Sequence, residues 1–163
     1  MSKTLKITTL ALLAAASVAQ AQAVRSEKNM SLELANQIAA AGVAACQAGG
    51  YNVAVTVVDR AGGVRAVQRA DNAGPHTLAA SQQKAFTSAS AKNTTPAMME
   101  TAQKNPGAAN LVNIPGFLLL GGGVPVKVGN DVIGAVGIGG APAGNLDEQC
   151  ALAALDKVKD QLK

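Results

Sequence analysis

The stretch that decides the fold is VAVTVVDRAGGVRAVQRADNAGPHTLAASQQKAFTSA, residues 53–89. The continuous β-branched run at its start predicts a buried strand over 51–59. The paired glycines of the turn at 59–63 and the alternation of apolar and polar residues over 64–69 predict a half-exposed hairpin partner. A helical pattern follows over 77–91. A hairpin that leads directly into a helix is typical of an α+β domain.

Both flanks of this stretch continue the pattern. Ser31 is a predicted N-cap for a helix over 31–48, which Gly49 and Gly50 end. Further on, Thr95 as N-cap and Pro96 at the first helical position start a short helix. In chain order we then expect an irregular stretch over 104–116, strands near 117–120, 124–128 and 132–140, and a last helix capped by Asn145 or Asp147. The sum is an α+β fold: one antiparallel sheet of about five strands with helices packed on it.

Residues 1–23 have the order of a cleavable signal peptide. Two lysines come first, a charge-free apolar run over 7–19 follows, and small residues stand at the cleavage positions, so cleavage is expected after Ala21 or Ala23. The alternative is a membrane anchor, but the run is shorter than the ~20 apolar residues that span a bilayer. We therefore expect a periplasmic or secreted protein whose residues 24–163 form a single domain, with no membrane span.

The composition narrows the class of partner. Loss of Lys3 and Lys6 with the signal lowers the formal net charge from +4 to +2, and no Lys/Arg cluster remains, so we expect no nucleic-acid partner. The chain has no Trp, one Tyr and two Phe, and its apolar residues are mostly Ala and Val. Because small side chains bury little area each, oligomerisation is expected to supplement stability.

The two cysteines, Cys46 and Cys150, leave two interpretations open. Cys46 ends the first predicted helix and Cys150 lies in the first turn of the last. If these helices pack antiparallel on one face of the sheet, a disulfide joins them, which an oxidising compartment permits. The alternative is two separate buried thiols.

Several side chains are candidates for chemistry. The glycine clusters lack the spacing of phosphate-binding motifs. His76, the only histidine, is a candidate metal ligand or base, or a plain surface residue at a helix start. Lys84 could pair with Asp71 or hold an anionic ligand, or lie along the surface. Met98 and Met99 offer soft sulfur atoms, although methionines more often fill gaps in a core.

Residues 53–89 and 121–155 together resemble the GlcG/HbpS family, which also occurs as the C-terminal domain of PduO-type proteins. The matching features are the strand that ends in Asp59, the Lys84-Ala85 pair, the Gly123-Val124-Pro125 run, Gly134-x-x-Gly137 and Asp147 before the last helix. The resemblance implies a profilin/PAS-like fold, assembly into homo-oligomers and, for some members, haem binding. Family haem ligands include histidine and threonine, so His76, Thr94 and Thr95 are candidates here.

Three functions follow from these observations. The first is an exported homo-oligomer that binds haem or a related tetrapyrrole, with His76 as the metal ligand and Lys84, Thr94, Thr95 and Met98 as further cofactor-binding candidates. The second is an enzyme that acts on a small anionic metabolite, with Lys84 holding the anion and Asp71 or His76 as base. The third is an oligomeric scaffold without a small-molecule site. No catalytic residue is assigned from the sequence.

Overall fold

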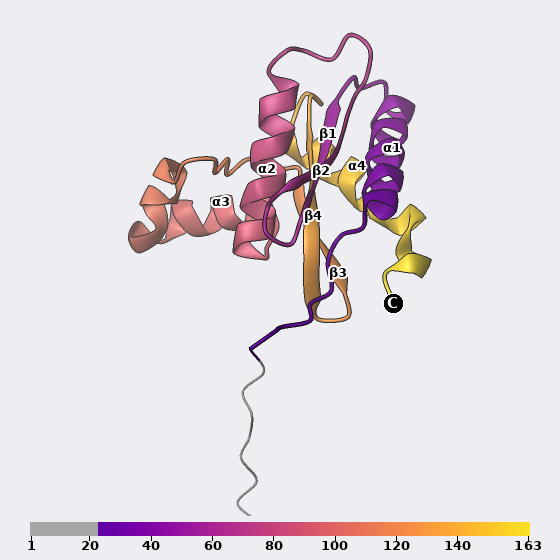
Figure 1. Cartoon of the computed structure of the whole chain (residues 1–163). Coiled ribbons are helices and arrows are strands. Elements are labelled where there is room, and N and C mark those ends of the chain that lie inside the picture. The colour runs from indigo at the N-terminus through magenta and orange to yellow at the C-terminus, as the bar shows by residue number, and fades with distance from the viewer. Residues whose placement is uncertain (1–22) are drawn as a thin grey trace, which may run out of the picture.

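The computed structural model describes residues 23–163, so nearly all of the predicted signal peptide (1–23) lies outside the described residues. Figure 1 shows how the elements are arranged. In chain order they are α1 (Leu32–Ala48), β1 (Ala54–Asp59), β2 (Val64–Arg69), α2 (Thr77–Ala91), α3 (Thr95–Lys104), the 3-10 helix η1 (Pro106–Asn113), β3 (Gly123–Val128), β4 (Asp131–Gly139), α4 (Gly144–Lys157) and the 3-10 helix η2 (Lys159–Gln161).

The strands form one antiparallel sheet in the order β2-β1-β4-β3, which confirms the α+β class. The sheet has four strands rather than about five, because residues 117–120 do not form one. Leu118 N donates to the hydroxyl of Thr87 at 2.8 Å, and the Phe117 ring packs edge-on against Phe86 with centroids 6.2 Å apart. This segment is therefore held against α2 and does not enter a strand ladder.

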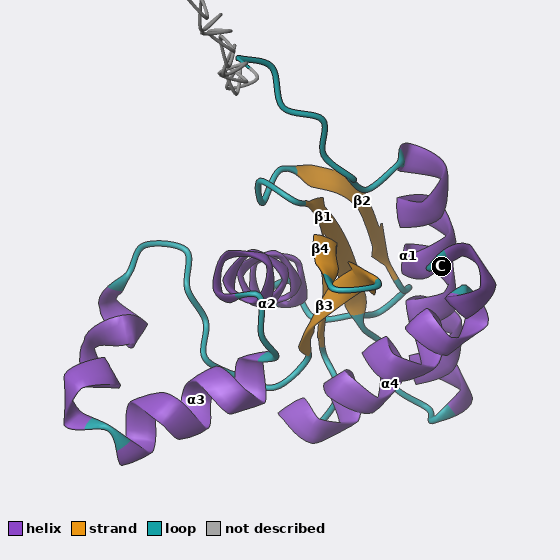
Figure 2. Cartoon of the chain, turned by 90° about the horizontal axis from the view of Figure 1, so that it is seen from below, coloured by secondary structure: helices purple, strands orange, loops and turns teal. Residues whose placement is uncertain are grey.

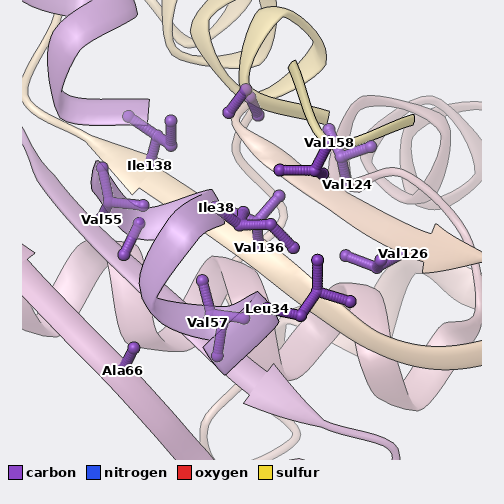
Figure 3. Close-up of a cluster of buried hydrophobic side chains, with 14 of the residues drawn as sticks. Leu34, Ile38, Val55, Val57, Ala66, Val124, Val126, Val136, Ile138 and Val158 are labelled. Atoms are coloured by element: carbon purple, nitrogen blue, oxygen red, sulfur yellow. The ribbon is translucent and has the colours of Figure 1, made fainter. Parts of the chain in front are cut away.

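Helices cover both faces of the sheet, α2 on one and α1 with α4 on the other (Figure 2). The main core lies under α1 and α4, where inward side chains of all four strands meet both helices (Figure 3). Its central members are Leu34, Ile38, Val55, Val57, Val124, Val126, Val136, Ile138 and Val158.

The face under α2 is built from much smaller groups. Its apolar cluster is Val58, Ala85, Ala89 and Ala135, and the Thr56 and Ser81 hydroxyls hydrogen-bond at 2.8 Å. A side chain at Gly137 would collide with the backbone of α2, so glycine there lets the helix lie directly on β4.

Two helix starts differ from the sequence prediction. Thr94, not Thr95, caps α3, because its hydroxyl accepts from Ala97 N at 3.4 Å. The last helix begins at Gly144. Its N-cap residue is Ala143, which makes no side-chain cap hydrogen bond, and the Asp147 side chain turns inward.

The segment from α3 to Leu120, which we call the arm, stands away from the sheet (Figure 2). Only Thr95 is buried within α3, and no residue of η1 is buried. The arm leaves Val112, Ile114 and Leu120 exposed. Among the described residues no helix has both the length and the apolar character needed to cross a membrane.

A disulfide joins Cys46 of α1 to Cys150 of α4, as one of the two sequence interpretations expects. The two Cα atoms are 5.3 Å apart and the bridge closes a separation of 104 residues. Because cross-linking so long a loop removes chain entropy from the unfolded state, the bridge stabilises the folded domain.

Replacing both cysteines tests this contribution. The Cys46→Ala/Cys150→Ala variant is expected to lose about 2–4 kcal/mol of unfolding free energy, since its unfolded chain regains the freedom of the open loop. Urea unfolding of both proteins measures the difference. Alkylation of the native protein without reductant is the control, and two labelled thiols per chain would contradict the bridge.

Candidate functional site

A buried ion pair lies where α2, β4 and α4 meet. The Lys84 ammonium of α2 donates to Asp147 Oδ2 at 2.7 Å and to the carbonyl of Ile138 at 2.9 Å. Lys84 is 1% exposed and Asp147 2% exposed. A charge so deeply buried is tolerated only when it is paired and hydrogen-bonded, and both groups meet that condition.

Asp147 reaches the pair from the first turn of α4. Its second carboxylate oxygen accepts from Ala141 N at 3.0 Å, so both oxygens have partners. Burial raises the pKa of Asp147 above its ordinary value, and the Lys84 ammonium and the backbone N–H groups of Ala141 and Gly140 oppose that rise.

Glycine gives the pair its room. Gly122 has φ +119°, and a Cβ there would lie 2.7 Å from Asp147 Cβ and 3.1 Å from Lys84 Nζ. The turn into β3 therefore accepts no side chain beside the ammonium.

The structure corrects two expectations for Lys84. Its partner is Asp147 and not Asp71, because Asp71 lies in an exposed turn before α2 while Lys84 points inward toward β4. Lys84 is also not a surface lysine. From the sequence, Asp147 is one of two candidate caps of the last helix. Its position in the first turn of an amphipathic helix, beside a glycine-rich turn, is the one sequence feature that points to a buried role.

The two threonines are committed to backbone contacts. Thr95 is fully buried, and its hydroxyl accepts from Gly123 N at 2.9 Å. Thr94 caps α3. Lys84 and Thr95 thus meet around the turn at 122–123, where a Cβ on Gly123 would strike both residues.

A pocket of about 300 Å³ opens beside this turn, and we call it the α3–α4 pocket. Met99 and Leu120 give it apolar walls, while Met98, the neighbouring methionine, is half-buried outside it. Burial raises the pKa of Glu148, which lies at its edge. The lining residues are Pro96, Met99, Leu120, Gly121, Gly144, Asn145 and Glu148.

His76 lies apart from these groups. It is exposed at the start of α2, and its side chain makes no cap hydrogen bond. Thr94 follows the other end of this 15-residue helix, which is about 22 Å long. One copy of the chain therefore does not bring His76 together with Thr94, Thr95 or Met98. Within residues 23–163 no three His, Cys, Asp or Glu side chains gather as a metal site.

Comparison with known proteins places the chain in a family. The family described as "Haem degrading protein HbpS-like" matches residues 30–156. The chain belongs to the HbpS-like family. Protein GlcG of Escherichia coli K12 is 37% identical over 109 residues, which cover 67% of this chain and 80% of GlcG.

Two solved structures of the same fold are informative. The crystal structure of HbpS is 35% identical, with a TM-score of 0.79, and the match covers 86% of this chain and 97% of HbpS. The crystal structure of a PduOC:heme complex has a TM-score of 0.70 over 78% of this chain and 94% of PduOC. At 23% identity, that second likeness shows the fold alone. The family and the fold class expected from the sequence are confirmed.

The ion pair predicts a pH-dependent defect. In Lys84→Met the Asp147 carboxyl stays buried without its cation, so its pKa rises further above the value in the unfolded chain. Between the pKa of the unfolded chain and the higher pKa of the folded state, the folded state keeps a proton that the unfolded chain releases. Stability therefore falls as the pH rises through this interval. We expect the variant to lose about 3–5 kcal/mol near neutral pH. The loss should shrink as the pH approaches ~4, where an ordinary aspartate titrates.

Urea unfolding at both pH values measures this effect. The matched control is Lys84→Met/Asp147→Asn, which carries no buried charge and should lose the pH dependence. An equal deficit at both pH values in Lys84→Met would count against a charged Asp147.

Proposed function

We propose that this protein is an exported homo-oligomer that binds haem or a related tetrapyrrole. The observation that carries the proposal is the family match, which spans 30–156 and therefore nearly the whole described domain. The likeness to HbpS supports it, and a fold neighbour has been crystallised as a complex with heme.

His76 is the side chain that we assign to the haem iron. Imidazole is a common axial ligand, and the His76 ring makes no cap hydrogen bond at its helix start. The Thr94 and Thr95 hydroxyls already accept backbone hydrogen bonds, and the Lys84 ammonium is held by Asp147. The same ion pair occupies the lysine that the enzyme hypothesis assigns to the anion.

A second copy would supply the apolar cover that one copy lacks. Pockets that enclose small molecules measure roughly 300–1,000 Å³. The α3–α4 pocket, at about 300 Å³, is at the low end of that range, and His76 does not line it. The exposed apolar residues of the arm support self-association. The apolar leader over 1–23 and the Cys46–Cys150 bridge support export to an oxidising compartment.

Haem titration tests the iron ligand. Titration of the purified protein with hemin should shift the Soret band of hemin, and His76→Ala should weaken binding by about tenfold or more, because the iron loses its imidazole. Gln83→Ala, which changes another exposed polar residue of α2, is the control and should bind as the wild type does. Unchanged affinity in His76→Ala would reject His76 as ligand, and no Soret change in the wild type would reject haem.

Light scattering tests the assembly. The wild-type protein should have the mass of an oligomer, and Ile114→Asp should reduce it, because a carboxylate would be buried in the proposed contact. Val24→Asp is the control, since Val24 is 83% exposed near the N-terminus and far along the chain from the arm. A monomeric wild-type protein would refute the oligomer.

A further inference from the structure

The outer edge of β2 is open. β2 is a terminal strand of the sheet and pairs only with β1 among the described residues. Ala70 N donates to Val53 O at 2.9 Å, just beyond the last pair of the ladder. Because backbone bonds alternate along an antiparallel pair, the N–H and C=O groups of Val67 and Arg69 point to the open edge. Such an edge is a template for an added strand.

Apolar side chains line the sheet face beside this edge. Val64 is opposite Val58 and Val67 is opposite Thr56, so both lie on the α2 side of the sheet. Each is 46% exposed, because α2 lies over β1 and β4 and leaves β2 largely uncovered.

The flank of α2 supplies the facing wall. Leu78, Gln82 and Phe86 recur at four-residue spacing, and Leu78 is 41% exposed. Phe86 reaches the β1–β2 turn, where a Cβ on Gly62 would touch its ring. A pocket of about 340 Å³ lies at that end.

Unpaired positive charge flanks the apolar residues. Arg65 and Arg69 have no carboxylate partner within residues 23–163, whereas the nearby Arg60 pairs with Glu27. The Arg69 guanidinium donates to the carbonyl of Ala73, a contact that leaves its charge unneutralised.

These charges disfavour a second copy of the same strand. Arg65 is the extra residue of a β-bulge, since its neighbours Ala66 and Val64 pair with Val57 and Val58. The open-edge groups of Val67 and Arg69 still allow two β2 strands to pair antiparallel about Val67, and that pairing brings Arg69 of each strand beside Arg65 of the other. Like charges directly opposite each other destabilise a strand pair. A strand with carboxylates at those positions would gain two opposite-charge pairs instead.

We propose that the β2 edge binds an extended acidic segment of a partner protein as an added strand. The segment has an apolar residue opposite Val67 and carboxylates opposite Arg65 and Arg69. This surface does not include His76 or the α3–α4 pocket, so it stands independently of haem binding.

The test uses two blocked synthetic peptides and ¹⁵N-labelled full-length mature protein. The acidic peptide, Glu-Thr-Val-Thr-Glu, should shift the amide resonances of Val67 and Arg69. The basic peptide, Lys-Thr-Val-Thr-Lys, should bind at least about tenfold more weakly, because two attractive pairs become repulsive.

Two variants at one position separate edge pairing from general charge attraction. Val67→Pro removes an N–H that has no partner within residues 23–163, and proline is tolerated on edge strands, so the fold should survive while peptide binding is lost. Val67→Thr keeps the N–H and should bind. Equal binding of both peptides, binding that survives Val67→Pro, or no shift at millimolar peptide would overturn the proposal. Amides of β2 that are already protected by self-association without peptide would also overturn it.

Discussion

The buried pair of Lys84 and Asp147 is the constraint on which the rest of the site depends. Two opposite charges out of water must keep each other and their remaining hydrogen-bond partners, or the fold carries an uncompensated charge. The partners come from the end of β4 and the start of α4, so the pair fixes α2 relative to both. Gly122 must stay without a side chain beside it. The ion pair therefore positions the walls of the α3–α4 pocket, although neither Lys84 nor Asp147 lines it.

Small side chains produce the second feature of the fold, the close approach of α2 to the sheet. With Gly137 beneath it, α2 lies directly on β4, and hydroxyl contacts such as Thr56–Ser81 replace large apolar groups. Such a face buries less apolar area per residue than the Val- and Ile-rich face under α1 and α4. The disulfide between α1 and α4 adds a covalent constraint on the opposite face.

Local patterns predicted most of the fold. The β1–β2 hairpin and α1 with its Ser31 cap follow from periodicity, turn residues and helix ends. The Cys46–Cys150 bridge was one of two interpretations that the sequence left open, and the packing of α1 against α4 decides it. The strand expected at 117–120 does not form, because Leu118 N donates to the Thr87 hydroxyl of α2. No local sequence pattern reveals this contact. The partner of Lys84 lies 63 residues away, and only the packed sheet brings it near. His76 was grouped with Thr94 although a full helix separates them.

The family match suggests haem binding, and the geometry limits which side chains could contribute. The Thr94 and Thr95 hydroxyls and the Lys84 ammonium already have partners within the domain. His76 makes no cap hydrogen bond at its helix start. The most direct test is the absorption spectrum of the protein purified from the cells that produce it. Protein that binds haem in its native compartment should show a Soret band from the bound haem. A spectrum without that band, from protein that also takes up no added hemin, would contradict it.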